Sequence, residues 1–280
     1  MLKTFKCKNF LSFKDEINFS LQRQENDNPH KEAYFTLQGE KLLKNVVVYG
    51  ANASGKSNFT KAFVFFHNFI VSSYKNALEN LDNPIPTIPF LLNTKTEKSP
   101  SFFEIEIVKK EKKFIYGFEI SQKKVHREWL YQYPQKKILF ERNNKGIKSN
   151  KTHFKEATTT LKQDPNPGSK VLFLSLLANN NKKISSEVVQ EIKKINVYPA
   201  ENRNLILEKG FEYYKKYPQE VLSFLQEADF NIKDFLFEEE EMNKNKREKN
   251  IKNIYKTHNR NNRENLYTLK KKRYYKKKQK

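Results

Sequence analysis

The sequence predicts an α/β fold, in which a mixed sheet surrounds one long helix and an antiparallel β arm follows. Three observations support this class. Val46, Val47 and Val48 form a short β-branched run suited to a buried parallel strand. Residues 58–74 repeat apolar side chains at helical spacing. Residues 102–141 contain four runs in which aromatic or aliphatic residues alternate with charged ones, as in an antiparallel meander.

A glycine-rich turn connects the first run to the helix and carries the clearest chemical signal in the chain. Its sequence matches G-x-x-x-x-G-K-[ST], the phosphate-binding loop (P-loop, or Walker A). Glycines let successive backbone N–H groups point at a phosphate, and the following helix adds its positive N-terminal end. We expect Lys56 to reach the β- and γ-phosphates and Ser57 to offer its hydroxyl to Mg²⁺. The predicted nucleotide-binding residues are Gly50, Ala51, Asn52, Ala53, Ser54, Gly55, Lys56, Ser57 and Asn58.

A chance glycine–lysine turn would also produce this spacing. The strand pattern before it and the helix pattern after it are the context that the motif requires, so we interpret the region as a P-loop NTPase lobe built around the Walker A helix. The expected cofactors are ATP and Mg²⁺.

The length and composition of the chain limit the location and the partners that we expect for it. The chain has 280 residues, long enough to bury a sizeable core, and a single cysteine, Cys7, which excludes an intramolecular disulfide. We therefore expect a reducing, cytoplasmic location. The sequence contains no secretory signal and no apolar run near the roughly 18 residues of a membrane span, so we expect no membrane partner.

The positive charge is concentrated near the C-terminus. Residues 243–280 contain 16 Lys or Arg and two Glu, and so supply 14 of the 22 net positive charges. We predict an ATP-binding region at 1–241 and a basic, disordered tail at 242–280. Such a tail is most often a solvated appendage, but it can also bind phosphate backbones, which makes DNA a candidate partner. The amino-acid composition changes sharply after Glu241, and this change has two explanations. The segment is either a natural basic tail or the product of a shifted or interrupted reading frame, and we favour the second.

The remaining pattern predicts a hairpin before the loop and short elements after the meander. Residues 22–39 are expected to be a surface excursion, and 143–168 a loop. We expect the single tryptophan, Trp129, to pack against a sheet rather than to stack on a base. The other predicted elements are strands at 2–9, 17–21, 195–198 and 233–237, meander strands at 102–108, 112–121, 123–133 and 136–141, and helices at 171–178, 185–194 and 218–228.

Two motifs together resemble a known family. Asn9-Phe10-x-Ser12-Phe13-Lys14-Asp15, followed by Tyr49–Asn58, is similar to the opening of SMC/RecF-type ABC ATPases. The resemblance is strongest to bacterial AAA-type ATP-binding proteins grouped with overcoming-lysogenization-defect and abortive-infection ATPases, and it extends loosely to about residue 240. It implies that Asn52 lies beside the phosphates and that the hairpin forms part of the adenine and ribose side. It also implies paired ATPase heads, in a homodimer or with a partner chain.

A second acidic site for hydrolysis is not recognisable in the sequence. A Walker B strand would be four apolar residues followed by Asp-Glu, and the nearest segment, Phe235–Glu241, has too short an apolar run. No signature segment follows it. We therefore predict an ATP-binding protein of the AAA/ABC ATPase class whose hydrolysis needs a second lobe. The alternative is a nucleic-acid-binding repair or phage-defence component with a vestigial nucleotide site.

Overall fold

The computed structural model describes residues 1–24, 31–79, 83–109, 111–164, 168–198, 203–228, 232–240, 250–258 and 264–268. The chain divides into two compact units, residues 1–197 and 198–280, and each is described by itself.

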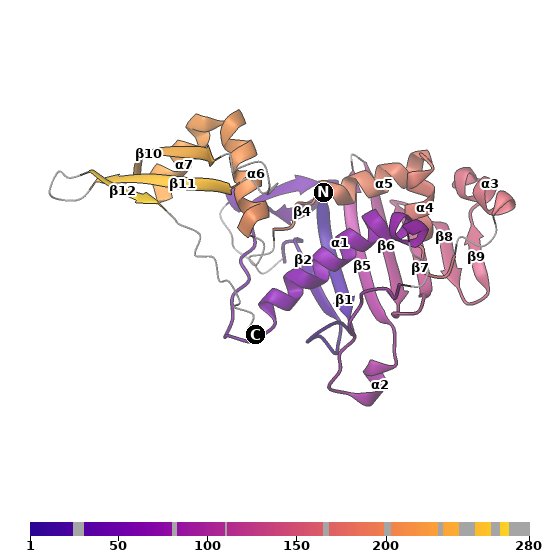
Figure 1. Cartoon of the computed structure of the whole chain (residues 1–280). Helices are drawn as coiled ribbons and strands as arrows, with labels where there is room; N and C mark the ends of the chain where they lie inside the picture. The colour runs from indigo at the N-terminus through magenta and orange to yellow at the C-terminus, as the bar shows by residue number, and fades with distance from the viewer. Residues whose placement is uncertain are drawn as a thin grey trace. The chain divides into compact units, whose positions relative to one another are not determined.

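The first unit is built on a seven-stranded sheet with the order β2-β1-β5-β6-β7-β8-β9 (Figure 1). Each neighbouring pair is antiparallel. The hairpin and meander predicted from residue alternation are therefore confirmed, and they form one sheet because β1 pairs with β5. The strands are β1 (Leu2–Lys8), β2 (Ile17–Ser20), β5 (Ser101–Lys109), β6 (Lys112–Ile120), β7 (Val125–Tyr133), β8 (Lys137–Asn143) and β9 (Gly146–Ser149).

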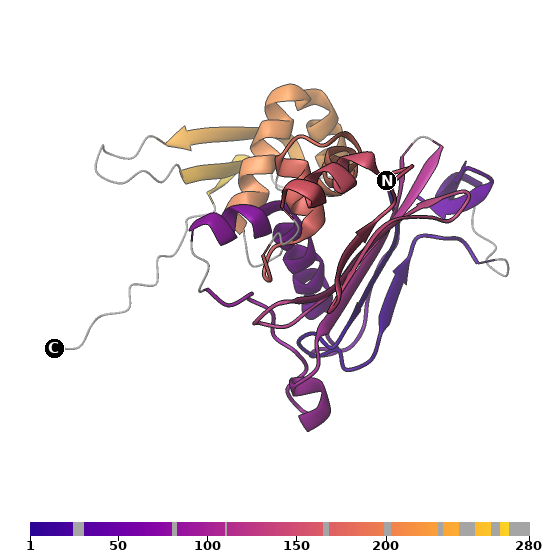
Figure 2. The same ribbon diagram turned by 90° about the vertical axis from the view of Figure 1, so that its right-hand side faces the viewer.

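Helices cover one face of this sheet (Figure 2). The longest is α1 (Lys56–Glu79), which confirms the helix predicted at 58–74. Helices α4 (Phe173–Asn179) and α5 (Lys183–Lys193) lie beside it and confirm the two helices predicted there. A single turn, α2 (Thr94–Glu97), precedes β5. The α/β class predicted from the sequence is therefore confirmed.

Aromatic rings fill the space between α1 and the sheet. Phe66 of α1 is fully buried and stacks on Phe118 of β6, with ring centroids 5.3 Å apart and an interplanar angle of 10°. Phe5 of β1 and Phe103 of β5 lie next to the same ring, at 5.4 and 6.3 Å. Burial of side chains of this size stabilises a domain by about 1.5–3 kcal/mol each, which explains why the apolar face of α1 is held against the sheet.

A second hairpin occupies part of the region predicted to be a surface excursion. It follows a 3₁₀ turn (Lys31–Ala33) and consists of β3 (Tyr34–Leu37) and β4 (Glu40–Leu43). Gln38 and Gly39 both have positive φ, at 53° and 79°, as a two-residue type I′ turn requires. The excursion expected at 22–39 is therefore wrong at its C-terminal end, while residues 25–30 lie outside the described ones.

The parallel strand predicted at Val46–Val48 is wrong. These residues form no strand, and their side chains are 40%, 79% and 53% exposed. A parallel strand is normally covered on both faces and paired at its edges. Among the described residues, all strand pairs are antiparallel and none of them includes the valine run.

Two further predictions in the first unit are wrong. The segment 143–168 is not a loop throughout, because Gly146, at φ +114°, closes the β8–β9 hairpin and helix α3 (Lys155–Gln163) follows. Residues 165–167 of that segment lie outside the described ones. No strand forms at 195–198: the N–H of Ile195 donates to the carbonyl of Ile192, which continues the end of α5 as a turn.

The second unit contains helices α6 (Arg203–Lys216) and α7 (Pro218–Ala228) and a three-stranded antiparallel sheet. Helix α7 confirms the helix predicted after Pro218, and α6 had no counterpart in the sequence prediction. Strand β10 (Ile232–Glu240) contains the strand expected at 233–237 and pairs with β11 (Asn250–His258), which pairs with β12 (Glu264–Thr268). These last two strands lie within the segment for which the sequence predicts a disordered tail.

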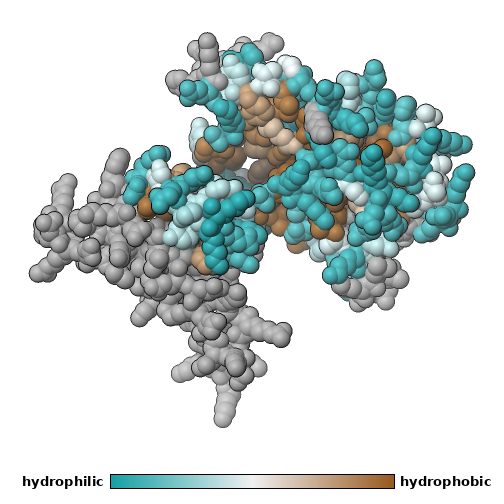
Figure 3. Space-filling model, turned by 90° about the horizontal axis from the view of Figure 1, so that it is seen from above, coloured by the Kyte–Doolittle hydropathy of each residue, from teal (hydrophilic) through white to brown (hydrophobic). Residues whose placement is uncertain are grey.

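The surface of the chain is largely hydrophilic where its residues are coloured in a view from above (Figure 3). This agrees with a composition in which charged residues make up 31%. Within the described part of the chain, no helix combines the length and the apolar character that crossing a membrane would need.

Candidate nucleotide-binding site

The Walker A residues form an open turn immediately before α1. Gly50 to Ser54 are exposed, as is Ser57, whereas Gly55, Lys56 and Asn58 are half-buried. Ala53 and Gly55 have positive φ, at 62° and 98°, and these two reversals curl the chain into the helix. The N–H of Ser54 donates to the carbonyl of Ala51 at 3.3 Å, which closes the turn.

The ammonium group of Lys56 lies over this turn. Its Nζ donates to the carbonyl oxygens of Gly50 and Ala51, at 2.6 and 2.7 Å. Helix α1 begins at Lys56, so its first N–H groups have no acceptor within the helix, and its 24 residues place a positive dipole end at the same point. No acidic residue stands in its first turn. A lysine, several N–H donors and a helix N-terminus thus converge on one exposed position, which suits a polyanion.

The connector between β1 and β2 supports the loop from behind. A Cβ atom at residue 55 would lie 3.2 Å from the Ser12 hydroxyl and 3.3 Å from the Phe13 ring, in addition to the strain of the positive φ. Glycine at position 55 therefore allows the loop to approach the connector closely. The Asn58 carboxamide donates to the Ser12 hydroxyl at 2.9 Å, which ties the connector to the first turn of α1.

An aromatic cavity of about 270 Å³ opens next to the loop. The loop side is formed by Ser54, Gly55 and Lys56. The rings of Phe19 and Phe59 form part of the opposite side, with centroids 5.1 Å apart. The remaining lining residues are Phe13, Ile17, Asn18, Val48 and Tyr49. A cavity that is cationic on one side and aromatic on the other suits a ligand with a phosphate end and a flat apolar end.

The family resemblance implies that the hairpin forms one side of the nucleotide pocket, but it does not indicate which hairpin residues line the cavity. Phe13 and Phe19 come from the hairpin and Phe59 from α1, so only the folded chain brings them together. Phe59 could have been found from the sequence, because it lies one helical turn after Gly55, and its N–H donates to the Gly55 carbonyl.

Asn9 has a different role from the loop residues. Its side chain is buried and its Nδ2 donates to the carbonyls of Thr96 and Ser99 at 2.8 and 2.9 Å, while its Oδ1 accepts from the N–H of Phe90. The asparagine of the Asn-Phe-x-Ser-Phe motif therefore fixes the segment around α2, and the serine and phenylalanine of the same motif support the P-loop.

A comparison with known families matches residues 46–267 to an AAA domain, AbiEii toxin-like, of type IV toxin–antitoxin systems. The match begins at the valine run before the P-loop and covers well over half of the chain. The chain belongs to this AAA-domain family. Neither the curated proteins nor the solved structures contain a match.

Membership of the AAA-domain family agrees with the geometry of the loop. The family is one of P-loop ATPases, so the coarse class predicted from the Walker A motif is confirmed. The matched region includes residues 242–267, part of the segment with the basic composition.

Proposed function

We propose that this AAA domain binds a nucleoside triphosphate, as its Mg²⁺ complex, at residues 50–58. The observation that carries the proposal is the Lys56 ammonium, held over the exposed turn by the carbonyls of Gly50 and Ala51. A phosphate that enters the turn replaces these carbonyls as the partner of Lys56. It also accepts hydrogen bonds from the unpaired N–H groups at the start of α1.

The base and ribose lie against the aromatic side of the adjoining cavity. Phe13, Phe19 and Phe59 provide flat apolar surfaces there, which favour a purine through stacking and burial. ATP is the expected ligand, by resemblance to SMC/RecF-type ATPases, and Asn52 is then the loop residue that lies beside the phosphates.

A Mg²⁺ ion at this site would be held mainly by the phosphates of the bound nucleotide. Ser57 is the second residue of α1, and its exposed side chain supplies one hydroxyl ligand. Among the described residues, no three His, Cys, Asp or Glu side chains gather into a metal site. A magnesium ion typically keeps several waters and uses substrate phosphates with only one or two protein ligands, so a single serine is sufficient. When bound, the ion neutralises charge on the β- and γ-phosphates.

We further propose that hydrolysis requires a second ATPase head, supplied by another copy of this chain or by a partner. Lys56 and Ser57 position the phosphates, but the attacking water also needs an acidic or polar residue to orient it. The isolated chain therefore binds ATP and turns it over slowly. Robust Mg²⁺-dependent hydrolysis by the purified monomer would contradict this part of the proposal.

The test is equilibrium binding of ATP, measured by calorimetry with the wild-type chain and with Lys56→Ala. Loss of the ammonium should weaken binding by at least tenfold. Lys44→Ala is the matched control, because Lys44 is an exposed lysine a few residues before the loop, and its affinity should equal that of the wild type. Equal affinities for all three chains would exclude the loop as the binding site.

A further inference from the structure

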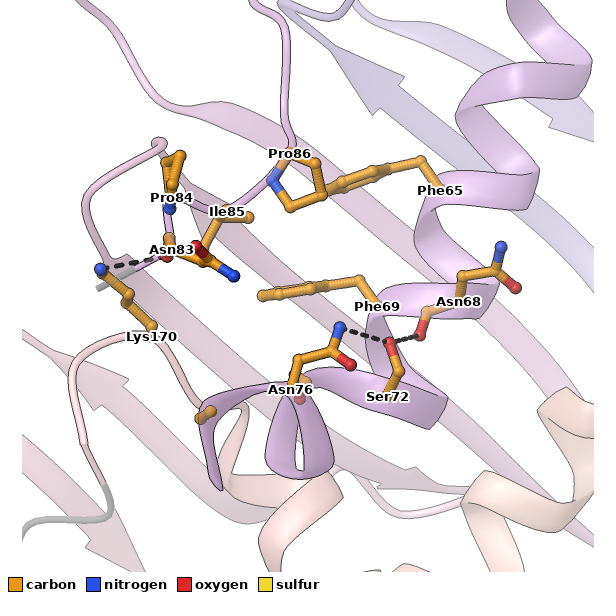
Figure 4. A pocket seen from close by; sticks show the side chains of 12 residues that line it. Phe65, Asn68, Phe69, Ser72, Asn76, Asn83, Pro84, Ile85, Pro86 and Lys170 are labelled. Carbon is orange, nitrogen blue, oxygen red and sulfur yellow. Dashed lines mark hydrogen bonds between the residues drawn. The ribbon is translucent and has the colours of Figure 1, made fainter. Parts of the chain in front are cut away.

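A second and larger cavity lies along the C-terminal half of α1. Its volume is about 640 Å³, within the range of roughly 300–1,000 Å³ that is typical of small-molecule sites. Figure 4 shows that it is lined by one side of α1, by the segment 83–86 that leads toward β5, and by Lys170. All of these residues belong to the first unit.

The apolar wall of this cavity is flat. The rings of Phe65 and Phe69 lie nearly parallel, with an interplanar angle of 13° and centroids 5.7 Å apart. Ile85 and Pro86 face them from the neighbouring segment (Figure 4). Phe65 is half-buried, whereas Phe69 behind it is buried at 7% exposure. The accessible part of the Phe65 ring suits a planar, aromatic ligand.

The polar wall can both donate and accept hydrogen bonds. The carboxamide of Asn76 donates to the Ser72 hydroxyl at 3.2 Å, which uses one of its two N–H donors and fixes its orientation. The carboxamide of Asn83 lies on the other side of the cavity (Figure 4). A carboxamide presents a donor beside an acceptor, the arrangement that pairs with the edge of a nucleobase.

The charge of the cavity favours an anion. Lys170 donates to the Asn83 carbonyl at 3.1 Å and brings a positive charge to the rim. The described residues that line the cavity include no aspartate or glutamate.

We propose that this cavity binds a nucleoside monophosphate, with the base on the Phe65 and Phe69 wall, its edge on Asn76 and Asn83, and its phosphate near Lys170. The site is separate from the P-loop. Asn76 follows Lys56 by twenty residues of one continuous helix, which corresponds to about 30 Å at 1.5 Å per residue. The proposal therefore does not depend on nucleotide binding at the loop.

The experiment uses the full chain with Lys56→Ala, which weakens the loop as a competing site. Calorimetric titration with AMP, GMP, CMP and UMP should show one binding site for at least one of them. Adding Asn76→Leu or Lys170→Gln should weaken that binding at least tenfold. Lys145→Gln is the matched control, since Lys145 is an exposed lysine of the β8–β9 turn, and it should leave the affinity unchanged. The fluorescence of Trp129 during urea unfolding reports whether each variant is folded.

Two further probes separate the parts of the ligand. Adenosine and inorganic phosphate should each bind more weakly than AMP, because each lacks one half of the contacts. The proposal is overturned if no monophosphate binds the Lys56→Ala chain at millimolar concentration. It is equally overturned if folded Asn76→Leu and Lys170→Gln variants keep full affinity, or if phosphate alone binds as tightly as every monophosphate.

Discussion

Replacing Glu128 with glutamine should lower the free energy of unfolding of the first unit by about 3 kcal/mol, because this fully buried carboxylate links the sheet to α4. Its Oε1 accepts from the Tyr116 hydroxyl at 2.9 Å and from the N–H of Leu174 at 3.0 Å. Its Oε2 accepts from the N–H of Phe173 at 2.8 Å and lies 3.9 Å from Nη1 of Arg142. The side chain thus satisfies the first N–H groups of a helix whose own N-cap makes no side-chain bond.

The expected loss of unfolding free energy follows because a glutamine side chain cannot accept all the hydrogen bonds that the Glu128 carboxylate accepts. In either orientation its NH₂ group faces a backbone N–H, of Phe173 or of Leu174, and leaves a buried donor without an acceptor, at about 1–3 kcal/mol. This cost overlaps with that of breaking the buried pair with Arg142, which is about 3–5 kcal/mol in total. Arg142 also donates to the carbonyls of Val171 and Gly168, at 2.6 and 2.8 Å, and these bonds keep the total near the lower end of that range.

The assay is urea unfolding followed by the fluorescence of Trp129, which is the only tryptophan and the next residue after Glu128. Burial raises the pKa of the Glu128 carboxyl, so the comparison is made at pH 8, where the carboxylate is favoured. The matched control is Glu119→Gln, because Glu119 pairs with the exposed guanidinium of Arg127 at 3.2 Å and should contribute less than about 0.5 kcal/mol. Equal unfolding midpoints for the two variants would refute this account of Glu128.

Three other predictions concern single positions. Gly117→Ala should destabilise the first unit by about 1–3 kcal/mol and shift the emission of Trp129, because the new Cβ would lie 2.3 Å from that indole and 2.8 Å from the Phe103 carbonyl; an unchanged spectrum and midpoint would contradict this. Burial raises the pKa of the Cys7 thiol to about 12, so a thiol reagent at pH 8 should label Cys7 only in denaturant. The free energy of unfolding should fall as the pH rises above about 8.5, the ordinary thiol pKa, because the unfolded chain then loses the thiol proton and the folded chain keeps it. Rapid labelling of the native chain would contradict this prediction. Gly55→Ala should weaken ATP binding at least tenfold in a filter-binding assay, since its φ of +98° disfavours any side chain, and wild-type affinity would argue against the loop geometry.

The parts of the fold that were predicted correctly depend on local patterns. The apolar spacing of α1 and the alternation in the strands β5 to β8 report which face of each element is buried, and burial decides both elements. Pro218 at the first turn of α7 is a similar local signal.

The parts that were missed depend on neighbours that no local pattern reveals. The run Val46–Val48 has the composition of a strand, but strand formation needs a partner, and its side chains are exposed in the described structure. Helix α3 has a polar sequence whose place is set by Glu156, because its carboxylate accepts from the N–H groups of Ile184 and Ser185 at 3.1 and 3.0 Å. That contact joins residues nearly thirty positions apart, so the pattern of apolar and polar residues around α3 does not reveal it.

The same division applies to the candidate site. The P-loop motif can be recognised in the sequence because its residues are consecutive, from Gly50 to Ser57, and their contacts with a nucleotide stay a prediction. The aromatic wall could not be assigned residue by residue, because Phe13 and Phe19 lie at least forty residues before Phe59 in the chain. The cavity at Asn76 and Lys170 is a purely tertiary feature with no motif.

Hydrogen–deuterium exchange of the backbone, measured with and without Mg²⁺-ATP, tests the central claim most directly. If phosphates bind the N–H groups of the loop and of the first turn of α1, peptides that cover residues 50–58 should become the most strongly protected, and Lys56→Ala should abolish the protection. Saturating ATP that leaves these peptides unchanged, or that protects them equally in the Lys56→Ala chain, would contradict the account.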